Sequence, residues 1–297
     1  MIKAIDLFCG CGGLSLGFQQ AGFEIVAAFD NWKKAVEIYN ENFQHKAELK
    51  DIRELSADYL KNFCAEVIIG GPPCQDYSSA GKRNEKNNAD LTIKFAELVC
   101  EVNPKFFLME NVAGIIKSET LPKALSLFKN FNYGLTQIIL DASLCNVPQK
   151  RKRFFLIGEL GGEDNFLKNG LEKNLSKKSM TIRDYLGEEF GINFYYRHPR
   201  SYARRGIFSI DEPSSTIRGV NRPIPANYKI HLSDATKNLS EVRPLTTLER
   251  ARIQTFPQNF KFSGTKTELE QIIGNAVPVN LSNYVGKIFL DYINEKF

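Results

Sequence analysis

Short apolar runs alternate with amphipathic segments along the first half of the chain. The runs have the length and composition of strands, whereas segments such as Trp32–Asn42 and Thr92–Val102 carry apolar residues at helical spacing. This alternation predicts βαβ units and an α/β fold with a doubly wound, mostly parallel, Rossmann-like sheet. The expected strands are Lys3–Phe8, Ile25–Phe29, Val67–Ile69, Phe106–Met109, Leu135–Leu140 and Phe154–Ile157.

The second half loses this regularity. From Thr181 to Glu241 the sequence contains prolines, tyrosines and arginines without a clear helical pattern. Helical spacing returns in "LTTLERARIQTF", where Thr246 and Glu249 fit a capping box, and again after "GNAVPVN" near the C-terminus. The expected division is a larger domain of residues 1–180 completed by 272–297, and a smaller, irregular domain of residues 181–271.

The unusual residues of the first half stand where the expected strands end. The glycine loop "CGCGG" follows the first strand, and Asp30 follows the second. Cys74 and Glu110 come soon after two later strands. In an open α/β sheet these positions line one crevice, where ligands bind. The loop lacks the lysine of a phosphate loop, and Asp30, about 20 residues further on, suits an acid that binds ribose hydroxyls.

Cys74 stands on a rigid turn, "GGPPCQDYS", between a strand and an expected helix. A thiol near a helix N-terminus has a lowered pKa, which favours the nucleophilic thiolate. The alternative is an inert, buried cysteine, which is the expected state of the other five cysteines. A Cys–His protease is not indicated, because no histidine falls at the strand ends.

Glu110 and two arginines are candidate partners of this thiol. The apolar run before Glu110 predicts partial desolvation, which raises the pKa of a carboxyl group; a helix N-terminal acid is the alternative. Residues 135–158 indicate an antiparallel hairpin, and Gln149, Arg151 and Arg153 alternate along its second strand. The two arginines would bind an anion or a base carbonyl, unless the strand is simply basic and exposed.

Composition narrows the class of protein. The net charge of +5 favours a nucleic-acid partner, and no apolar run approaches the about 20 residues that span a bilayer. The N-terminus does not resemble a signal peptide, so we expect a cytoplasmic protein with reduced cysteines. Because there is no CxxC pair and the three histidines are scattered, no metal site is expected.

Taken in order, these motifs resemble those of the DNA (cytosine-5)-methyltransferases, particularly the compact bacterial enzymes of restriction–modification systems. The matching segments cover nearly the whole chain: "DLFCGCGG", "GGPPCQDYS", "MENV", "QKRKR", "RPLTTLERARIQTFP" and "GNAVPV". The resemblance implies sequence-specific methylation of cytosine C5 in duplex DNA, in the bacterial cytoplasm, to protect host DNA. A cognate restriction endonuclease would act on the same sites without binding this chain, and nothing in the sequence demands more than a monomer.

The resemblance also implies roles for single residues. Cys74 would attack C6 of a flipped-out cytosine, and Glu110 would hold and protonate N3. Arg153 would contact the cytosine O2, while Arg151 would support the carboxylate and a backbone phosphate. S-adenosylmethionine would be the methyl donor and S-adenosylhomocysteine the product. The residues expected to bind this cofactor are Phe8, Gly10, Gly12, Gly13, Leu14, Asp30, Asn31, Trp32, Asp51, Ile52, Pro73, Leu91 and Asn275.

Some positions depart from the family pattern. Asp30 replaces the more usual glutamate, and either Asn31 or Trp32 would cover the adenine. An "RGxLF" run is common after the cysteine, whereas this chain has "NADLT", in which only Leu91 is kept.

The smaller domain corresponds to the target-recognition domain and hinge of the family. Its arginines would read guanine edges in the major groove or bind phosphates, although the alternative for each is a solvated charge. The candidate DNA contacts are Gln75, Ser78, Gln149, Arg197, Arg204, Arg205, Arg218 and Arg222.

Three other functions fit parts of the pattern. An RNA cytosine methyltransferase would share the scaffold, and the sizeable arginine- and tyrosine-rich segment argues for DNA instead. A catalytically silent nucleic-acid-binding regulator would be expected to have lost Cys74, Glu110 or the arginine pair, yet all are present. A Rossmann-type oxidoreductase would be expected to carry a GxGxxG loop, which the first loop is not.

Overall fold

A seven-stranded sheet forms the centre of the computed structural model, which describes residues 1–73, 89–199, 201 and 204–296. All of its strands run parallel except β8, which is antiparallel to both neighbours. The predicted doubly wound, mostly parallel sheet is therefore confirmed. In spatial order the strands are β3 (Ala47–Leu49), β2 (Glu24–Asp30), β1 (Lys3–Leu7), β4 (Val67–Gly70), β5 (Phe106–Val112), β8 (Lys152–Leu160) and β6 (Tyr133–Asp141).

Each of the six expected strands is present, and the expected hairpin is β6 with β8. One boundary matters for function: β5 continues to Val112, so Glu110 lies within the strand and not after it. The helix-terminal interpretation of Glu110 is therefore wrong. The edge strand β3 was not predicted, because three residues are too few to show an alternating pattern.

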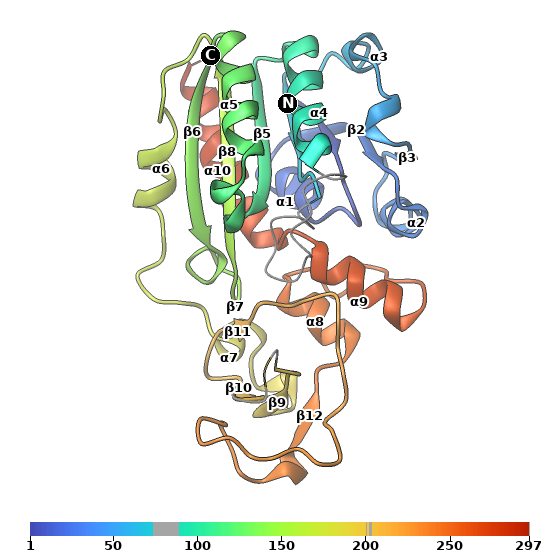
Figure 1. Ribbon diagram of the computed structural model, residues 1–297, viewed down its shortest axis with the longest axis vertical. Helices are drawn as coiled ribbons and strands as arrows, with labels where there is room; N and C mark the ends of the chain where they lie inside the picture. The colour runs from blue at the N-terminus through green and yellow to red at the C-terminus, as the bar shows by residue number, and fades with distance from the viewer. Residues whose placement is uncertain (74–88, 200, 202–203, 297) are drawn as a thin grey trace.

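Helices cover both faces of the sheet. Because neighbouring residues of a strand point to opposite faces, Ala4 of β1 is buried with Phe18 and Phe289 on one side, and Ile5 with Phe95 on the other. Figure 1 shows the C-terminal helix α10 behind the sheet and α4 and α5 in front of it. The helices are α1 (Gly13–Ala21), α2 (Lys33–Asn42), α3 (Ala57–Lys61), α4 (Ala89–Val102), α5 (Thr120–Asn130), α6 (Lys168–Lys173), α7 (Ile182–Leu186), α8 (Thr247–Ile253), α9 (Lys266–Asn275) and α10 (Val279–Lys296).

The segment that we expected to be irregular contains short elements. Strands β10 (Ile207–Ser209), β9 (Phe194–Tyr196) and β12 (Val242–Pro244) form a small sheet. A second small sheet pairs β11 (Ser214–Ser215) with β7 (Gln149–Lys150), so the segment is joined directly to the connection between β6 and β8. We call residues 181–245 the small lobe; Figure 1 shows it beyond the large sheet, on the side to which β6 points.

Helix α8 begins as predicted, with Thr246 and Glu249 forming a capping box. The division into 1–180 with 272–297 and 181–271 stays a prediction. Residue 271 lies within α9, and one hydrophobic cluster contains Tyr39 and Phe43 together with Phe208 and Ile253. The two expected domains thus share a core. None of the helices in the described ranges is long and apolar enough to cross a membrane.

Candidate active site

The carboxyl ends of β1, β2, β4 and β5 meet at one edge of the sheet, because these strands are parallel. Strand β8 runs the other way, so its first residues reach the same edge. The register pairs Val112 of β5 with Arg153 of β8. The sheet topology therefore brings Glu110 and Arg153 together, although 43 positions separate 110 from 153 along the chain.

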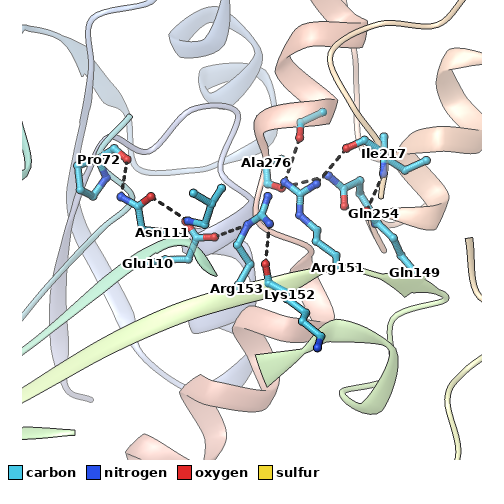
Figure 2. Close-up of polar contacts among 12 residues, drawn as sticks. Pro72, Glu110, Asn111, Gln149, Arg151, Lys152, Arg153, Ile217, Gln254 and Ala276 are labelled. Carbon is cyan, nitrogen blue, oxygen red and sulfur yellow. Dashed lines mark hydrogen bonds and ion pairs between the residues drawn. The ribbon is translucent and has the colours of Figure 1, made fainter. Parts of the chain in front are cut away.

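Glu110 and Arg153 form a buried ion pair at this edge. The Arg153 Nε atom lies 2.8 Å from Glu110 Oε1, and only 7% of Glu110 is exposed (Figure 2). Burial raises the pKa of the Glu110 carboxyl, although Arg153 and Arg151 oppose the rise. A Cβ atom at Gly71 would lie 3.2 Å from Glu110 Oε2, so the carboxyl group lies against the loop that leads to Cys74. A carboxyl group whose pKa is raised by burial can act as a proton donor to a ligand at the loop.

Asn111 connects the same strand to the same loop. Its side chain is buried, and its Nδ2 atom donates to the Pro72 carbonyl at 3.2 Å (Figure 2). Its Oδ1 atom accepts from the Val112 N–H at 2.8 Å, which fixes the orientation of the amide. No role for Asn111 was predicted from the sequence, although its place beside Glu110 was a usable signal. Of the predicted site residues, Cys74, Gln75 and Ser78 lie outside the described ranges.

A pocket of about 260 Å³ opens beside the glycine loop. The Asp30 carboxylate accepts from the N–H groups of Gly10 and Trp32, both at 2.8 Å, and burial raises its pKa. Gly10 has a left-handed backbone (φ 54°), and a Cβ atom there would meet nothing within 4 Å. Six of the predicted cofactor residues line the pocket: Phe8, Asp30, Asn31, Asp51, Ile52 and Leu91.

Two pocket residues have special geometry. Phe8 has φ of 67°, a left-handed conformation that is rare outside glycine and typical of functional sites when it occurs. Asp51 accepts from Arg53, which lowers the pKa of its carboxyl, and Asn31 Nδ2 also donates to it at 3.3 Å. The pocket therefore combines an apolar wall with two carboxylates, which suits a nucleoside.

Other predicted cofactor residues lie elsewhere. The Trp32 side chain packs against the hydrophobic core beside α2, so the structure places Asn31, not Trp32, at the pocket. The remaining residues do not line it: Gly12 lies against Phe43, Gly13 against the Val277 carbonyl, Leu14 is buried in the core, Pro73 is half-buried, and Asn275 is exposed at the end of α9.

Comparisons with known proteins agree with this geometry. Residues 2–290 match the family model of the C-5 cytosine-specific DNA methylases. The chain belongs to this family. The methylase is 57% identical to the Type II methyltransferase M.HindV of Haemophilus influenzae over 99% of its length and 98% of that protein. It is 53% identical to M.HgiDI of Herpetosiphon aurantiacus, over 99% of this chain and 96% of that one.

The fold is shared more widely. A crystal structure of S. pombe Dnmt2 methyltransferase has a TM-score of 0.74 with this chain at 20% identity, and 99% of each chain is covered. Family membership makes the chain a DNA cytosine C5-methyltransferase, and S-adenosylmethionine is the methyl donor of such enzymes. The oxidoreductase considered from the sequence is thereby excluded. Among the described residues, no group of His, Cys, Asp and Glu side chains could hold a metal ion.

The structure corrects two roles expected in the methylase. Gln149 was predicted to contact DNA, but its side chain is fully buried and bonded to Gln254 and to the Ile217 N–H. Arg151 was expected to reach a phosphate, but it is 1% exposed and donates to backbone carbonyls, including that of Ile217. Arg151 still acts electrostatically on the Glu110 carboxyl. Both residues have structural partners that the sequence pattern could not identify.

The predicted DNA-contacting arginines fall into three groups. Arg205 is held by Glu212 and lies over the Phe208 ring at 4.2 Å, so we assign it a structural role. Arg204 and Arg222 are exposed. Arg197 and Arg218 line a second pocket, of about 340 Å³, in the small lobe.

Proposed function

We propose that Cys74, Glu110 and Arg153 carry out the methylation of a cytosine that has been flipped out of duplex DNA. The C6 atom of a stacked cytosine cannot be approached from its face, so the base must leave the helix. The Cys74 thiolate forms a bond to C6, and the displaced electron pair is stabilised because Glu110 delivers a proton to N3. S-adenosylmethionine, when bound, supplies the methyl group that C5 accepts. Loss of the C5 proton to water then expels the Cys74 thiolate from C6, and the N3 proton returns to Glu110.

The burial of Glu110 beside Arg153 is the observation that supports this mechanism most strongly. A carboxyl group of ordinary pKa is almost entirely ionised at neutral pH, which makes it a poor proton donor to N3. Burial within β5 raises the pKa of Glu110, and Arg153 at 2.8 Å keeps the carboxyl group oriented toward the loop. Arg153 Nη1 also donates to the Lys152 carbonyl at 2.9 Å, which limits the freedom of the guanidinium group.

The residues that line the pocket beside the glycine loop support its assignment to S-adenosylmethionine. We assign the ribose hydroxyls to Asp30, whose carboxylate is already fixed by two backbone N–H groups. The apolar side chains of Phe8, Ile52 and Leu91 suit the adenine. The open space next to Gly10 lets a ligand approach the backbone closely.

We assign the choice of DNA sequence to the small lobe and infer that the enzyme acts as a monomer in the bacterial cytoplasm. The relatives M.HindV and M.HgiDI are both named Type II methyltransferases, and they match nearly the whole chain. This supports a role in protecting host DNA from a cognate restriction endonuclease. That endonuclease would recognise the same sites without a physical complex.

Transfer of tritium from labelled S-adenosylmethionine tests the function. Duplex DNA should be labelled far better than tRNA, and the reverse result would assign the enzyme to RNA. Wild type should form a covalent adduct with DNA that contains 5-fluorocytosine, because the fluorine cannot leave as a proton does. Cys74→Ser should abolish turnover while S-adenosylhomocysteine still binds. Absence of the adduct in active wild type would refute the role of Cys74.

A further inference from the structure

Gln149 and Arg151 come just before β8, the strand that carries Arg153, but they point away from the catalytic crevice. The backbone passes from β7 through Arg151 into β8, and Figure 2 shows Gln149 and Arg151 directed toward Ile217 and Gln254. Both side chains are almost completely inaccessible to solvent. Burying an amide and a guanidinium group is costly unless their hydrogen bonds are made. The hydrogen bonds of Gln149 and Arg151 therefore indicate which parts of the structure these two residues position.

Both residues hold the backbone of Ile217 in the small lobe. Gln149 Oε1 accepts from the Ile217 N–H at 2.8 Å, and Arg151 Nη1 donates to the Ile217 carbonyl at 3.0 Å. The pairing of β11 with β7 and the bond from Thr216 Oγ1 to the Lys150 carbonyl continue this contact. The next residue after Ile217 is Arg218, a predicted DNA contact.

Arg151 and Gln254 also bind the end of α9. Arg151 Nη2 donates to the Gly274 and Ala276 carbonyls at 3.0 and 3.1 Å, where a cation also complements the helix dipole. Gln254 Nε2 donates to the Ile273 and Ala276 carbonyls at 2.6 and 3.1 Å.

One amide–amide hydrogen bond joins the two halves of this network. Gln149 Nε2 donates to Gln254 Oε1 at 2.7 Å, so both functional groups of Gln149 are engaged. A Cβ atom on Gly274 would lie 2.4 Å from the Arg218 backbone, so α9 and the segment carrying Arg218 are in direct contact. The catalytic strand, the small lobe and α9 therefore meet at one buried network of Gln149, Arg151 and Gln254.

Resting on the function proposed above, we propose that the Gln149–Arg151–Gln254 network positions Arg218 and its neighbours relative to Arg153, and so determines how strictly the enzyme selects its target sequence. A buried network in which the amide groups of Gln149 and Gln254 are both hydrogen-bonded favours one arrangement of the segments that it joins. If the network is broken, Arg218 can shift while Glu110 and Arg153 keep their own contacts. Discrimination between sites then falls more than turnover at the correct site.

Gln149→Leu, Gln254→Leu and the double variant test this. Each variant should methylate the target sites of a plasmid to the same final extent as wild type. Cytosine-conversion sequencing then compares the methylation of target sites with that of sites that differ by one base pair. We expect the ratio of kcat/KM between these sites to fall about tenfold, the scale of one buried hydrogen bond left unmade. The loss in the double variant should be smaller than the sum of the two single losses, because both substitutions remove the Gln149–Gln254 bond. Binding of S-adenosylhomocysteine should be unchanged.

Tyr292→Phe is the matched control. It removes a hydrogen bond of 2.6 Å to Glu159, on α10 and away from the small lobe, and should leave discrimination intact. If a leucine variant does not fold, Thr216→Val should lower discrimination in the same direction but less. Equal discrimination in wild type, the folded variants and the control would overturn the proposal. Failure of wild type to methylate DNA would instead refute the proposed function.

Discussion

The Glu110 carboxyl group is subject to opposing influences that suit proton transfer. Two nearby guanidinium groups favour its ionised form, but burial has the larger effect and raises its pKa. A raised pKa keeps more of the group protonated at neutral pH, so activity should fall as pH rises through that value. The orientation of the carboxyl group comes from Arg153, and that of the neighbouring loop from Asn111.

Glu110→Gln keeps the size of the side chain but removes the transferable proton. We expect kcat to fall about 10²- to 10⁴-fold, the usual contribution of a general acid, while S-adenosylhomocysteine binds normally. Single-turnover transfer of tritiated methyl groups to duplex DNA measures this. Glu24→Gln, on the exposed start of β2, is the control. A kcat within twofold of wild type would show that N3 is protonated by another group.

A second buried carboxyl group belongs to Asp6 of β1. Its Oδ2 atom accepts from Ser15 at 2.5 Å, and Ser15 in turn accepts from Tyr39 at 2.9 Å. Within the described part of the chain, Oδ1 has no hydrogen-bond partner. Burial, with a contribution from the Asp30 charge, raises the pKa of Asp6 to about 8. The folded protein therefore holds a proton on Asp6 at neutral pH, and the unfolded chain does not.

This difference makes stability depend on pH. Because the folded-state pKa lies above the value of about 3.8 in the unfolded chain, the stabilising effect is complete below that value and is lost as pH rises to about 8. Asp6→Asn is neutral at every pH and should remove this loss, which is at most about 1.4 kcal/mol per pH unit. Urea denaturation of both proteins between about pH 5 and 9 measures it. The exposed Asp58→Asn should keep the wild-type slope; parallel slopes for wild type and Asp6→Asn would contradict the assignment.

At the scale of elements, a carboxylate organises the loops of the small lobe. Asp234 Oδ1 accepts from the N–H groups of Gly206 and Ile207, and Oδ2 accepts from the Tyr228 hydroxyl and the His231 N–H, all within 2.7–3.0 Å. Burial would raise the pKa of Asp234, but these hydrogen bonds lower it. These bonds fix the start of β10, next to Arg204, to the loop that carries Asp234, which is 28 residues from Gly206 along the chain.

Elements with a long, periodic pattern were predictable from the sequence, and short ones were not. The hairpin of β6 and β8 and the helices α2, α4 and α10 follow from spacing alone. The three-residue strands of the small lobe depend on partners distant in the sequence, which leave no local pattern.

The same limit applies to the site. Alternation placed Gln149, Arg151 and Arg153 on one face of a strand, but only Arg153 pairs with Glu110, whereas Gln149 and Arg151 turn into the interior. Gln149 is buried because Gln254 lies opposite, 105 residues further along the chain. Residues at strand ends were easier to assign to the site, because the carboxyl ends of parallel strands meet at one edge of the sheet. This rule correctly predicted that Asp30 and Glu110 lie at the same edge.

At the scale of the whole molecule, the larger and smaller parts of the methylase are joined by extensive contacts. Tyr39 and Phe43, which lie beside the cofactor loop, belong to the same hydrophobic cluster as Phe208 of the small lobe and Ile253 of α8. Helix α9 passes through the expected boundary, and the Gln149–Gln254 bond crosses between the parts. Shared core and buried polar contacts should couple their unfolding.

We therefore expect a single unfolding transition in scanning calorimetry, with equal calorimetric and van't Hoff enthalpies, despite a chain of 297 residues. S-adenosylhomocysteine at about 100 times its Kd should stabilise the folded state by about 2.7 kcal/mol and move the entire transition to higher temperature. Intrinsic fluorescence, from the tyrosines of both parts and Trp32, should follow the same curve. Independent domains would behave differently: two transitions would be resolved, and only the one containing the cofactor pocket would respond to the ligand.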